Sequence, residues 1–395
     1  MLITVIIFWT SFSVLFFCYI GYGLLLFLFN QLKALFVPDK KSEMITEWLP
    51  VTLIITAYNE AAVLEKKVAN TLSIDYPADK LNIIFVTDGS TDGSGGIIQQ
   101  YPSLVLLHQD ERKGKLAAVK RAMHYVKTPV VVFSDANTEL NKECIQRIVS
   151  HYANHKTGGV AGEKKIINDH KASAVGDAEG LYWKYESFMK KQDAGFNTVV
   201  GAAGELFSIR TELFTRLNDN IILDDFVISM KVCLQGYRIE YEPGAFAAEF
   251  PSASLVEEEK RKIRISAGAY QSIGYLKEAL NFIKYPLLSF QYLSRRLLRW
   301  VFCPLMLIVL LWSDILIVVN PATHLIYVLF LYGQLSFYVI AFTGWLLTRA
   351  GKRPGILTIP FYFVFMNYCL VKGFIKFLTG KQTILWEKSM RQAAE

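Results

Sequence analysis

Apolar residues gather at the two ends of this chain and alternate with polar residues in its middle. Residues 1–30 contain no Asp, Glu, Lys or Arg, and a helix of that length measures about 45 Å, enough to cross a bilayer with some tilt. Further apolar runs lie at about 301–319, 325–347 and 356–371. The first two predict membrane-spanning helices. The third contains Pro360 and Asn367, and it either spans the membrane or lies partly re-entrant.

The middle of the chain, about 50–280, alternates short apolar runs with stretches of helical periodicity. The expected strands are Val51–Thr56, Leu81–Val86, Leu104–Leu107 and Pro129–Phe133, and the expected helices are Glu60–Ser73 and Lys115–Val126. This alternation predicts an α/β domain with a doubly wound, mostly parallel sheet. In such sheets ligands bind beyond the carboxyl ends of the strands.

These patterns divide the chain into five parts. They are a transmembrane anchor at 1–31, a globular domain at 48–255, amphipathic interface helices at 256–300, transmembrane helices at 301–378 and a basic tail at 379–395. The interface helices are expected because charged residues there mix with aromatic and apolar ones, as in helices that lie on a membrane surface.

The distribution of charge suggests how the chain sits in the membrane. The net charge is +7, and the basic excess lies after Val256, next to the apolar runs. This placement indicates cytoplasmic flanks and anionic lipid headgroups, and it does not indicate nucleic-acid binding. Lys33, Lys40 and Lys41 place the end of the first span in the cytoplasm. Four spans would put the C-terminus outside, whereas its lysines favour the inside, and the sequence leaves this conflict open.

Three polar motifs follow or join the predicted strands. Asp88-Gly89-Ser90-Thr91-Asp92-Gly93 ends the second strand, where a carboxylate can accept hydrogen bonds from a base or sugar, although a plain Gly-rich turn has the same composition. Asp135-Ala136-Asn137 ends the fourth strand, and its two oxygen ligands can hold Mg²⁺ or Mn²⁺ or form an Asx turn. Arg112-Lys113-Gly114-Lys115 can meet a diphosphate or be a solvated turn.

Two further motifs lie later in the chain. Asp224 and Asp225 open an apolar helix, where a carboxylate either caps the helix or acts as a general base whose pKa the neighbouring carboxylate raises. The basic cluster 260–264 either grips a diphosphate or attracts lipid headgroups. The five cysteines show no CxxC spacing and the six histidines no ligand spacing, which argues against a disulfide framework and a zinc site.

The order of these motifs resembles the family-2 inverting glycosyltransferases of GT-A fold, in the membrane branch with cellulose, hyaluronan, chitin and poly-N-acetylglucosamine synthases. The resemblance covers about 48–300. It rests on these segments: Thr56-Ala57-Tyr58-Asn59-Glu60, the 88–93 motif, Arg112 with Gly114 and Lys115, Asp135-Ala136-Asn137, Gly201-Ala202-Ala203-Gly204 and Asp224-Asp225.

The resemblance implies a role for each matching residue. The implied donor contacts are Tyr58, Glu60 and Asp88 for the nucleoside and Lys115 near the diphosphate. The metal-binding DxD motif corresponds to Asp135 and Asn137, and the catalytic TED motif to Asp224 and Asp225. The Gln and Arg of QxxRW correspond to Arg261 and Arg264. The implied cofactor is Mg²⁺ or Mn²⁺ and the implied donor a UDP-sugar.

The chain departs from the family pattern at three motifs. Asn137 replaces the second Asp of DxD, Asp224 replaces the Glu of TED, and Arg261 and Ile265 replace the Gln and Trp of QxxRW. The missing Trp, which belongs to the acceptor site of the processive synthases, weakens the case for a long-chain polymerase.

The expected function is therefore sugar transfer with inversion to a glycan or lipid-linked acceptor, in cell-envelope or exopolysaccharide synthesis. The expected location is a bacterial inner or plasma membrane with the globular domain in the cytoplasm. Two alternatives stay open, a non-processive glycolipid glycosyltransferase and a non-catalytic sensor of nucleotide sugars.

Overall fold

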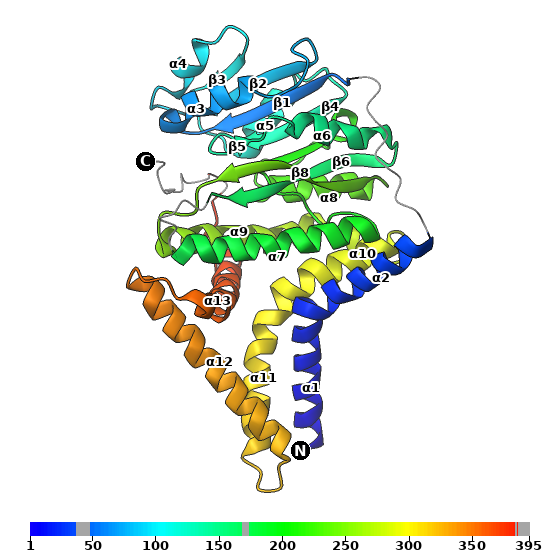
Figure 1. Ribbon diagram of the computed structural model, residues 1–395, viewed down its shortest axis with the longest axis vertical. Coiled ribbons are helices and arrows are strands. Elements are labelled where there is room, and N and C mark those ends of the chain that lie inside the picture. The colour runs from blue at the N-terminus through cyan, green and yellow to red at the C-terminus, as the bar shows by residue number, and fades with distance from the viewer. Residues whose placement is uncertain (37–47, 168–173, 384, 386–395) are drawn as a thin grey trace.

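The computed structural model describes residues 1–36, 48–167, 174–383 and 385. Lys40 and Lys41, on which part of the predicted topology rests, lie outside the described residues, as does most of the predicted basic tail. A sheet domain forms one end of the molecule, helices α7 and α9 lie beneath it, and long apolar helices extend away from it (Figure 1).

One eight-stranded sheet organises the sheet domain, in the order β3-β2-β1-β4-β7-β6-β8-β5. The strands are β1 (Val51–Ala57), β2 (Leu81–Asp88), β3 (Val105–Gln109), β4 (Val130–Asp135), β5 (Glu139–Leu140), β6 (Thr157–Ile166), β7 (Leu206–Arg210) and β8 (Arg238–Glu249). The first four strands pair in parallel, whereas β7 runs antiparallel to both β4 and β6. The predicted α/β fold is confirmed. The sequence pattern did not resolve the half of the sheet formed by β7, β6, β8 and β5, in which β7 and β5 run against the other strands.

Both faces of the sheet are covered, which explains the continuous apolar runs of its central strands. Along β1, Ile54 packs into one hydrophobic core, whereas Leu53 and Ile55 pack into the other. Helices α5 and α8 cover the first face, and helices α3, α4 and α6 cover the second. Successive side chains of a strand point to opposite faces, so every position of β1 is buried.

The helices of the sheet domain connect its strands, and longer helices come after them in the chain. The α-helices of this part are α3 (Ala61–Leu72), α4 (Ser94–Gln99), α5 (Lys115–Met123), α6 (Cys144–Ser150), α7 (Ala174–Phe196), α8 (Asp224–Leu234), α9 (Leu255–Tyr275) and α10 (Pro286–Tyr292). Short helical turns lie at η2 (His151–Ala153), η3 (Thr211–Leu213) and η4 (Lys277–Leu280). The strands and helices expected over 51–133 are all present, with ends that differ by one to three residues.

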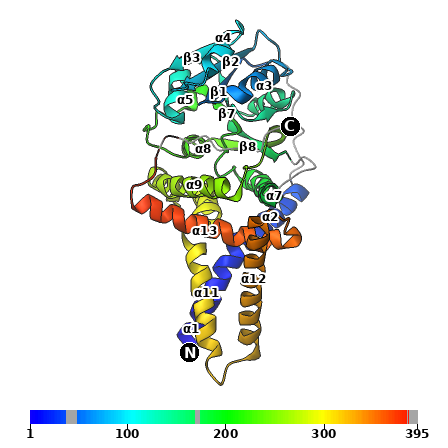
Figure 2. The same ribbon diagram turned by 90° about the vertical axis from the view of Figure 1, so that its left-hand side faces the viewer.

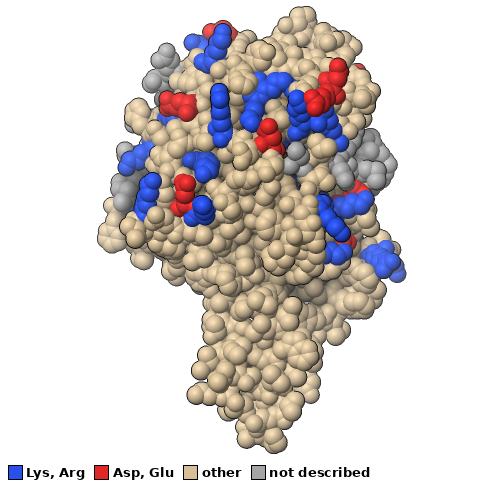
Figure 3. Space-filling view, turned by 180° about the vertical axis from the view of Figure 1, so that it is seen from behind, with Lys and Arg blue, Asp and Glu red and all other residues tan. Residues whose placement is uncertain are grey.

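Among the described residues, four helical stretches are long and apolar enough to cross a membrane: Leu2–Phe36, Pro286–Val318, Leu325–Arg349 and Gly355–Leu378. They contain α1 (Leu2–Phe16), η1 (Phe17–Gly21), α2 (Tyr22–Phe36), η5 (Leu293–Phe302), α11 (Cys303–Val318), α12 (Leu325–Arg349), η6 (Gly355–Leu357) and α13 (Thr358–Leu378). In Figure 3 the end of the molecule away from the sheet domain shows no charged side chain, whereas the sheet domain carries many.

Helix α13 lies across the direction of α11 and α12, beneath α9 (Figure 2). Tyr362 Oη donates to Glu258 Oε1 at 2.8 Å, and Lys372 Nζ donates to Glu259 Oε1 at 2.9 Å. At Gly373 the two helices touch so closely that a Cβ would collide with Ser266. The sequence left open whether this run spans the membrane or lies partly re-entrant. The structure shows a helix that packs against α9 along its length.

Candidate active site

A cavity of 640 Å³ lies between the carboxyl ends of β1 and β4, helix α9 and the start of the membrane helices. Its lining contains most of the predicted site residues: Tyr58, Glu60, Lys115, Asp135, Asn137, Asp224, Asp225, Arg261 and Arg264. The position agrees with the rule that ligands of open α/β sheets bind beyond the strand ends.

The loops after β1 and β2 are tied to each other at one edge of this cavity. The backbone N–H of Asn59 donates to Ser90 Oγ at 3.1 Å, and the Asn59 side chain accepts from the backbone N–H of Thr91 at 2.9 Å. Asp92 Oδ2 accepts from the backbone N–H of Ala61, the first residue of α3, at 2.9 Å. Asn59 adopts a φ of +53°, a region that Asn tolerates better than most residues. These bonds fix Tyr58 and Glu60 at the cavity wall.

Asp88 is fully buried and lies outside the cavity lining. Its Oδ2 accepts hydrogen bonds from the backbone N–H groups of Lys113 and Gly114, at 3.0 and 2.7 Å. Its Oδ1 lies 3.9 Å from Arg121 Nη1 and forms no hydrogen bond within the described part of the chain. Asp88 therefore shapes the loop that carries Lys115, a role that the sequence did not indicate.

Asp135 and Lys115 form an ion pair inside the cavity, with Nζ 2.6 Å from Oδ1. Burial alone would lower the pKa of Lys115, but the carboxylates of Asp135, Asp224 and Asp225 hold this pKa above its usual value. A cation that stays charged between these carboxylates can bind a diphosphate as a point charge.

The donor set around Asp135 fits a divalent cation held jointly with a diphosphate. Asp135 and Asn137 both line the cavity, and the Asn137 amide Nδ2 lies 3.5 Å from Glu249 Oε2, which turns the amide nitrogen toward Glu249. Over residues 1–36, 48–167, 174–383 and 385 there is no group of three or more His, Cys, Asp or Glu that could hold a metal ion alone. One carboxylate, one amide oxygen and phosphate oxygens together suit Mg²⁺ or Mn²⁺.

A buried lysine supports this loop from behind, and the sequence pattern did not reveal it. Lys67 of α3 donates to the Thr138 carbonyl at 2.8 Å and to Ser134 Oγ at 3.1 Å. Burial lowers the pKa of Lys67 to about 7, although the negative charge of Asp135 acts to raise it. The position of Lys67 in α3 could have indicated that it is buried, because Lys67 falls on the apolar face of this helix with Leu64.

Asp224 and Asp225 begin α8 on the opposite wall. Asp225 Oδ1 accepts from the backbone N–H of Phe226 at 2.8 Å. A Cβ added to Gly204 would lie 2.9 Å from Lys115 Nζ and 3.1 Å from Asp225 Oδ2. A larger residue at this position would therefore displace one or both of these groups. Burial and the negative charge of Asp224 raise the pKa of Asp225 to about 7, although the positive charge of Lys115 acts to lower it. A carboxylate with this pKa can take a proton near neutral pH.

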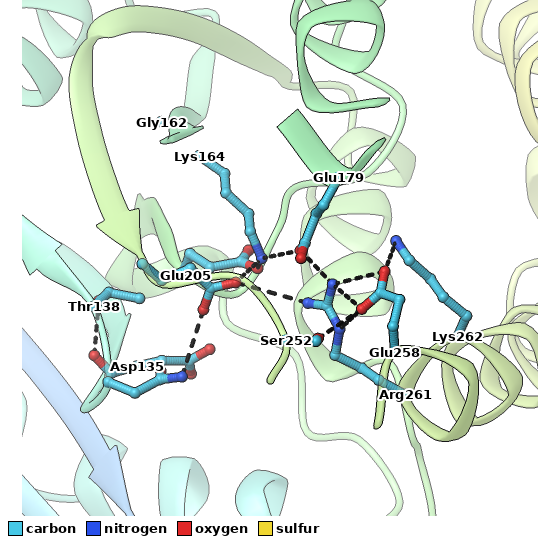
Figure 4. Close-up of polar contacts among 12 residues, drawn as sticks. Asp135, Thr138, Gly162, Lys164, Glu179, Glu205, Ser252, Glu258, Arg261 and Lys262 are labelled. Carbon is cyan, nitrogen blue, oxygen red and sulfur yellow. Dashed lines mark hydrogen bonds and ion pairs between the residues drawn. The ribbon is translucent and has the colours of Figure 1, made fainter. Parts of the chain in front are cut away.

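Arg261, by contrast, already has carboxylate partners. Its guanidinium contacts Glu179, Glu249 at 3.7 Å and Glu258 at 2.9 Å (Figure 4). Together with the ion pairs of Lys164 and Lys262, these contacts form a buried ion network, whose members are Lys164, Glu179, Glu205, Glu249, Glu258, Arg261 and Lys262. Four members of the network line the cavity: Glu205, Glu249, Arg261 and Lys262.

A second buried ion cluster lies where the cavity meets the membrane helices. Glu186 of α7 accepts from Arg295 at 2.6 Å and from Arg299 at 2.7 Å, and it lies 3.7 Å from Arg296. Arg296 also donates twice to the carbonyl of Val200, which precedes the Gly201–Gly204 loop. The cluster therefore links η5, which leads into the apolar helix α11, to the Gly201–Gly204 loop.

Comparisons with known proteins agree with this geometry. The model of the family described as Glycosyl transferase family 2 matches residues 52–217. A poly-beta-1,6-N-acetyl-D-glucosamine synthase from Staphylococcus aureus is 25% identical over 247 residues, which are 59% of this chain and 58% of that protein. A beta-monoglucosyldiacylglycerol synthase from Synechocystis is 27% identical over 202 residues, 48% of this chain and 41% of that protein. The chain thus spans less than two thirds of the length of either relative.

A solved structure resembles nearly the whole fold. The mannosyltransferase PcManGT from Pyrobaculum calidifontis, in complex with GDP-Man and Mn²⁺, matches with a TM-score of 0.68 and 20% identity, covering 95% of this chain and all of that chain. At this identity the likeness concerns the fold, including the apolar helices. Sequence motifs, sheet topology and these matches agree, and the chain carries a family 2 glycosyltransferase domain of GT-A fold.

Proposed function

We propose that this protein transfers a sugar from a nucleotide-sugar donor to an acceptor hydroxyl, with inversion at the anomeric carbon. The observation that carries the proposal is the arrangement of Asp225 and the Lys115–Asp135 pair in one cavity. It places a carboxylate with a raised pKa next to a fixed cation, which are the two groups that a single displacement needs.

In this mechanism the acceptor oxygen attacks the anomeric carbon while the bond to the diphosphate breaks. Asp225 takes the proton of the acceptor hydroxyl, and the nucleoside diphosphate leaves with the electron pair. Lys115 stabilises the charge that develops on the leaving group. Asp135 and Asn137 would hold a divalent cation, which supplies further positive charge to the diphosphate when bound.

The proposed location is a membrane, with the sheet domain on the cytoplasmic side. Helices α1, α11 and α12 would cross, and α13 would lie along the surface beneath α9. Three crossings put the C-terminus on the same side as the sheet domain, which supports the cytoplasmic placement of Lys372 and Lys376. The basic loop that contains Lys352 and Arg353 then also faces the cytoplasm, as the positive-inside rule requires.

Membrane vesicles that contain the protein test both the reaction and its sidedness. With a panel of UDP-glucose, UDP-N-acetylglucosamine and GDP-mannose, inverted vesicles should release nucleoside diphosphate from one donor, because nucleotide sugars do not cross the bilayer. Right-side-out vesicles should be inactive, and EDTA should suppress the release until Mn²⁺ or Mg²⁺ is restored. Donor binding without any release or transfer would contradict catalysis and favour a nucleotide-sugar sensor.

Asp224→Asn tests the charge coupling at the proposed base. Removal of the neighbouring negative charge should lower the pKa of Asp225 from about 7, by about one pH unit. Since Asp225 must be deprotonated to act, activity should rise with pH through this pKa, and the rise should occur at lower pH in the variant. The profile of kcat/KM against pH measures the shift. An unchanged midpoint would contradict the assignment of Asp225 as the titrating base.

A further inference from the structure

A second hollow lies next to the catalytic cavity, in the part of the molecule formed by the apolar helices. It is a groove of 460 Å³ between α11 and α12, whose lining includes Leu307, Leu310, Ile326, Leu329, Phe330 and Gly333. Phe363 of α13 lines both the groove and the catalytic cavity. Its ring lies 4.7 Å from that of Tyr19 and 5.7 Å from that of Phe337. The two hollows therefore meet at this aromatic cluster.

The groove suits hydrocarbon and not sugar. Gln334 and Tyr338 carry the only polar side-chain groups of its lining among the described residues. Gln334 Nε2 already donates to Asp314 Oδ2 at 2.6 Å, a bond that joins α12 to α11. A glycan chain in this groove would leave most of its hydroxyl groups without hydrogen bonds, which costs a few kcal/mol for each buried group. An alkyl chain has no such groups to satisfy.

The catalytic cavity changes character toward the groove. Asp225 and Lys115 lie at its charged end, and Phe363 and Leu370 of α13 line it toward the groove, where Asn367 and Arg299 lie beside Tyr19. The same cavity therefore offers charged groups to a polar head and apolar groups to a hydrocarbon tail attached to that head. This is the pattern expected for an amphiphile and not for a polymer that is polar along its whole length.

We propose that the acceptor is a membrane lipid, with its head oxygen at Asp225 and its hydrocarbon chain in the groove between α11 and α12. This inference rests on the proposed sugar transfer and names its substrate class. The anomeric bond to the diphosphate breaks, a bond to the lipid head oxygen forms, and the head proton passes to Asp225. Either a lipid alcohol or a lipid phosphate could supply the attacking oxygen. A hydroxyl head suits a carboxylate base better, because the proton of an alcohol is harder to remove than that of a phosphate.

The test traces the sugar label in inverted membrane vesicles supplied with the active radiolabelled donor. Label should move into chloroform–methanol as a single lipid species. If the label then withstands mild acid, the head is an alcohol, and if mild acid releases it, the head is a phosphate; either result supports the lipid acceptor. A ladder of water-soluble or insoluble oligomers would overturn the lipid acceptor but leave sugar transfer intact. Absence of any nucleotide release would instead overturn the proposed function itself.

A pair of variants on α12 tests the groove directly. Gly333 lines it and has no atom within 4 Å of an added Cβ, so Gly333→Phe should fill the groove without a clash. Val339 is 65% exposed and lies outside the lining, so Val339→Phe is the matched control. Gly333→Phe should reduce lipid labelling at least about tenfold, because several methylene groups of the lipid chain would no longer be buried in the groove. Donor hydrolysis in detergent should stay unchanged. Equal lipid labelling by the two variants would overturn the proposal.

Discussion

Asp225→Asn should abolish sugar transfer while donor binding persists. The amide keeps an oxygen that can accept the hydrogen bond from the Phe226 backbone N–H, so the start of α8 should keep its conformation. The variant loses the proton acceptor, and loss of a general base typically slows a reaction by about 10²–10⁴-fold. Titration with UDP, followed by a transfer assay with the active donor, measures the two properties separately.

The outcome for Asp225→Asn is informative in either direction. Transfer at a near-normal rate would contradict the assignment of Asp225, and loss of UDP binding would show that the side chain acts earlier than the chemical step. Asp224→Asn serves as the matched control, since it changes the adjacent carboxylate and should retain activity at a pH that suits the shifted profile.

Arg261→Met should destabilise the protein strongly. The guanidinium contacts three carboxylates in the buried ion network, of which Glu179 and Glu258 are fully buried. Removal of one partner from a buried ion pair typically costs about 3–5 kcal/mol, because the remaining charges stay buried without compensation. Thermal unfolding in detergent, compared with the wild type, measures the loss.

The adjacent Lys260→Met is the control for this experiment. The Lys260 side chain is 61% exposed and pairs with Glu257 on the surface of α9, and exposed pairs contribute about 0–1 kcal/mol. If Arg261→Met unfolded at the temperature of Lys260→Met and only weakened donor binding, Arg261 would be a donor contact, as the resemblance implies, and not a structural residue.

The order of the motifs was enough to predict the fold class and nine residues of the cavity lining. Strand ends in a parallel sheet lie at one edge, so Tyr58 and Asp135 could be placed together from their positions after β1 and β4. Asp224 and Asp225 were also expected in the site, since they open an apolar helix. Strand β7 was not predicted, because its run Leu206–Arg210 is short and no local pattern gives the direction in which it pairs with β4.

The buried charges were beyond the sequence for a different reason. Lys67, Glu186 and Glu205 lie in separate segments, and their partners come from segments up to 113 residues away. Apart from the position of Lys67 on the apolar face of α3, nothing local distinguishes these buried charged residues from charged residues on the surface. Asp88 shows the same limit, because no local pattern indicated that its carboxylate would bind the backbone of the loop that carries Lys115.

By itself the sequence determined the family, the sheet, the apolar helices and the candidate base, because these depend on local periodicity and on residue types at strand and helix ends. Only the tertiary structure decided that α13 lies across the other apolar helices, since its hydrophobicity is compatible with either course and its packing against α9 selects one. The tertiary structure also decided which charges pair and that an apolar groove lies next to the cavity that holds Asp225. Both depend on contacts between distant segments, which no local pattern encodes.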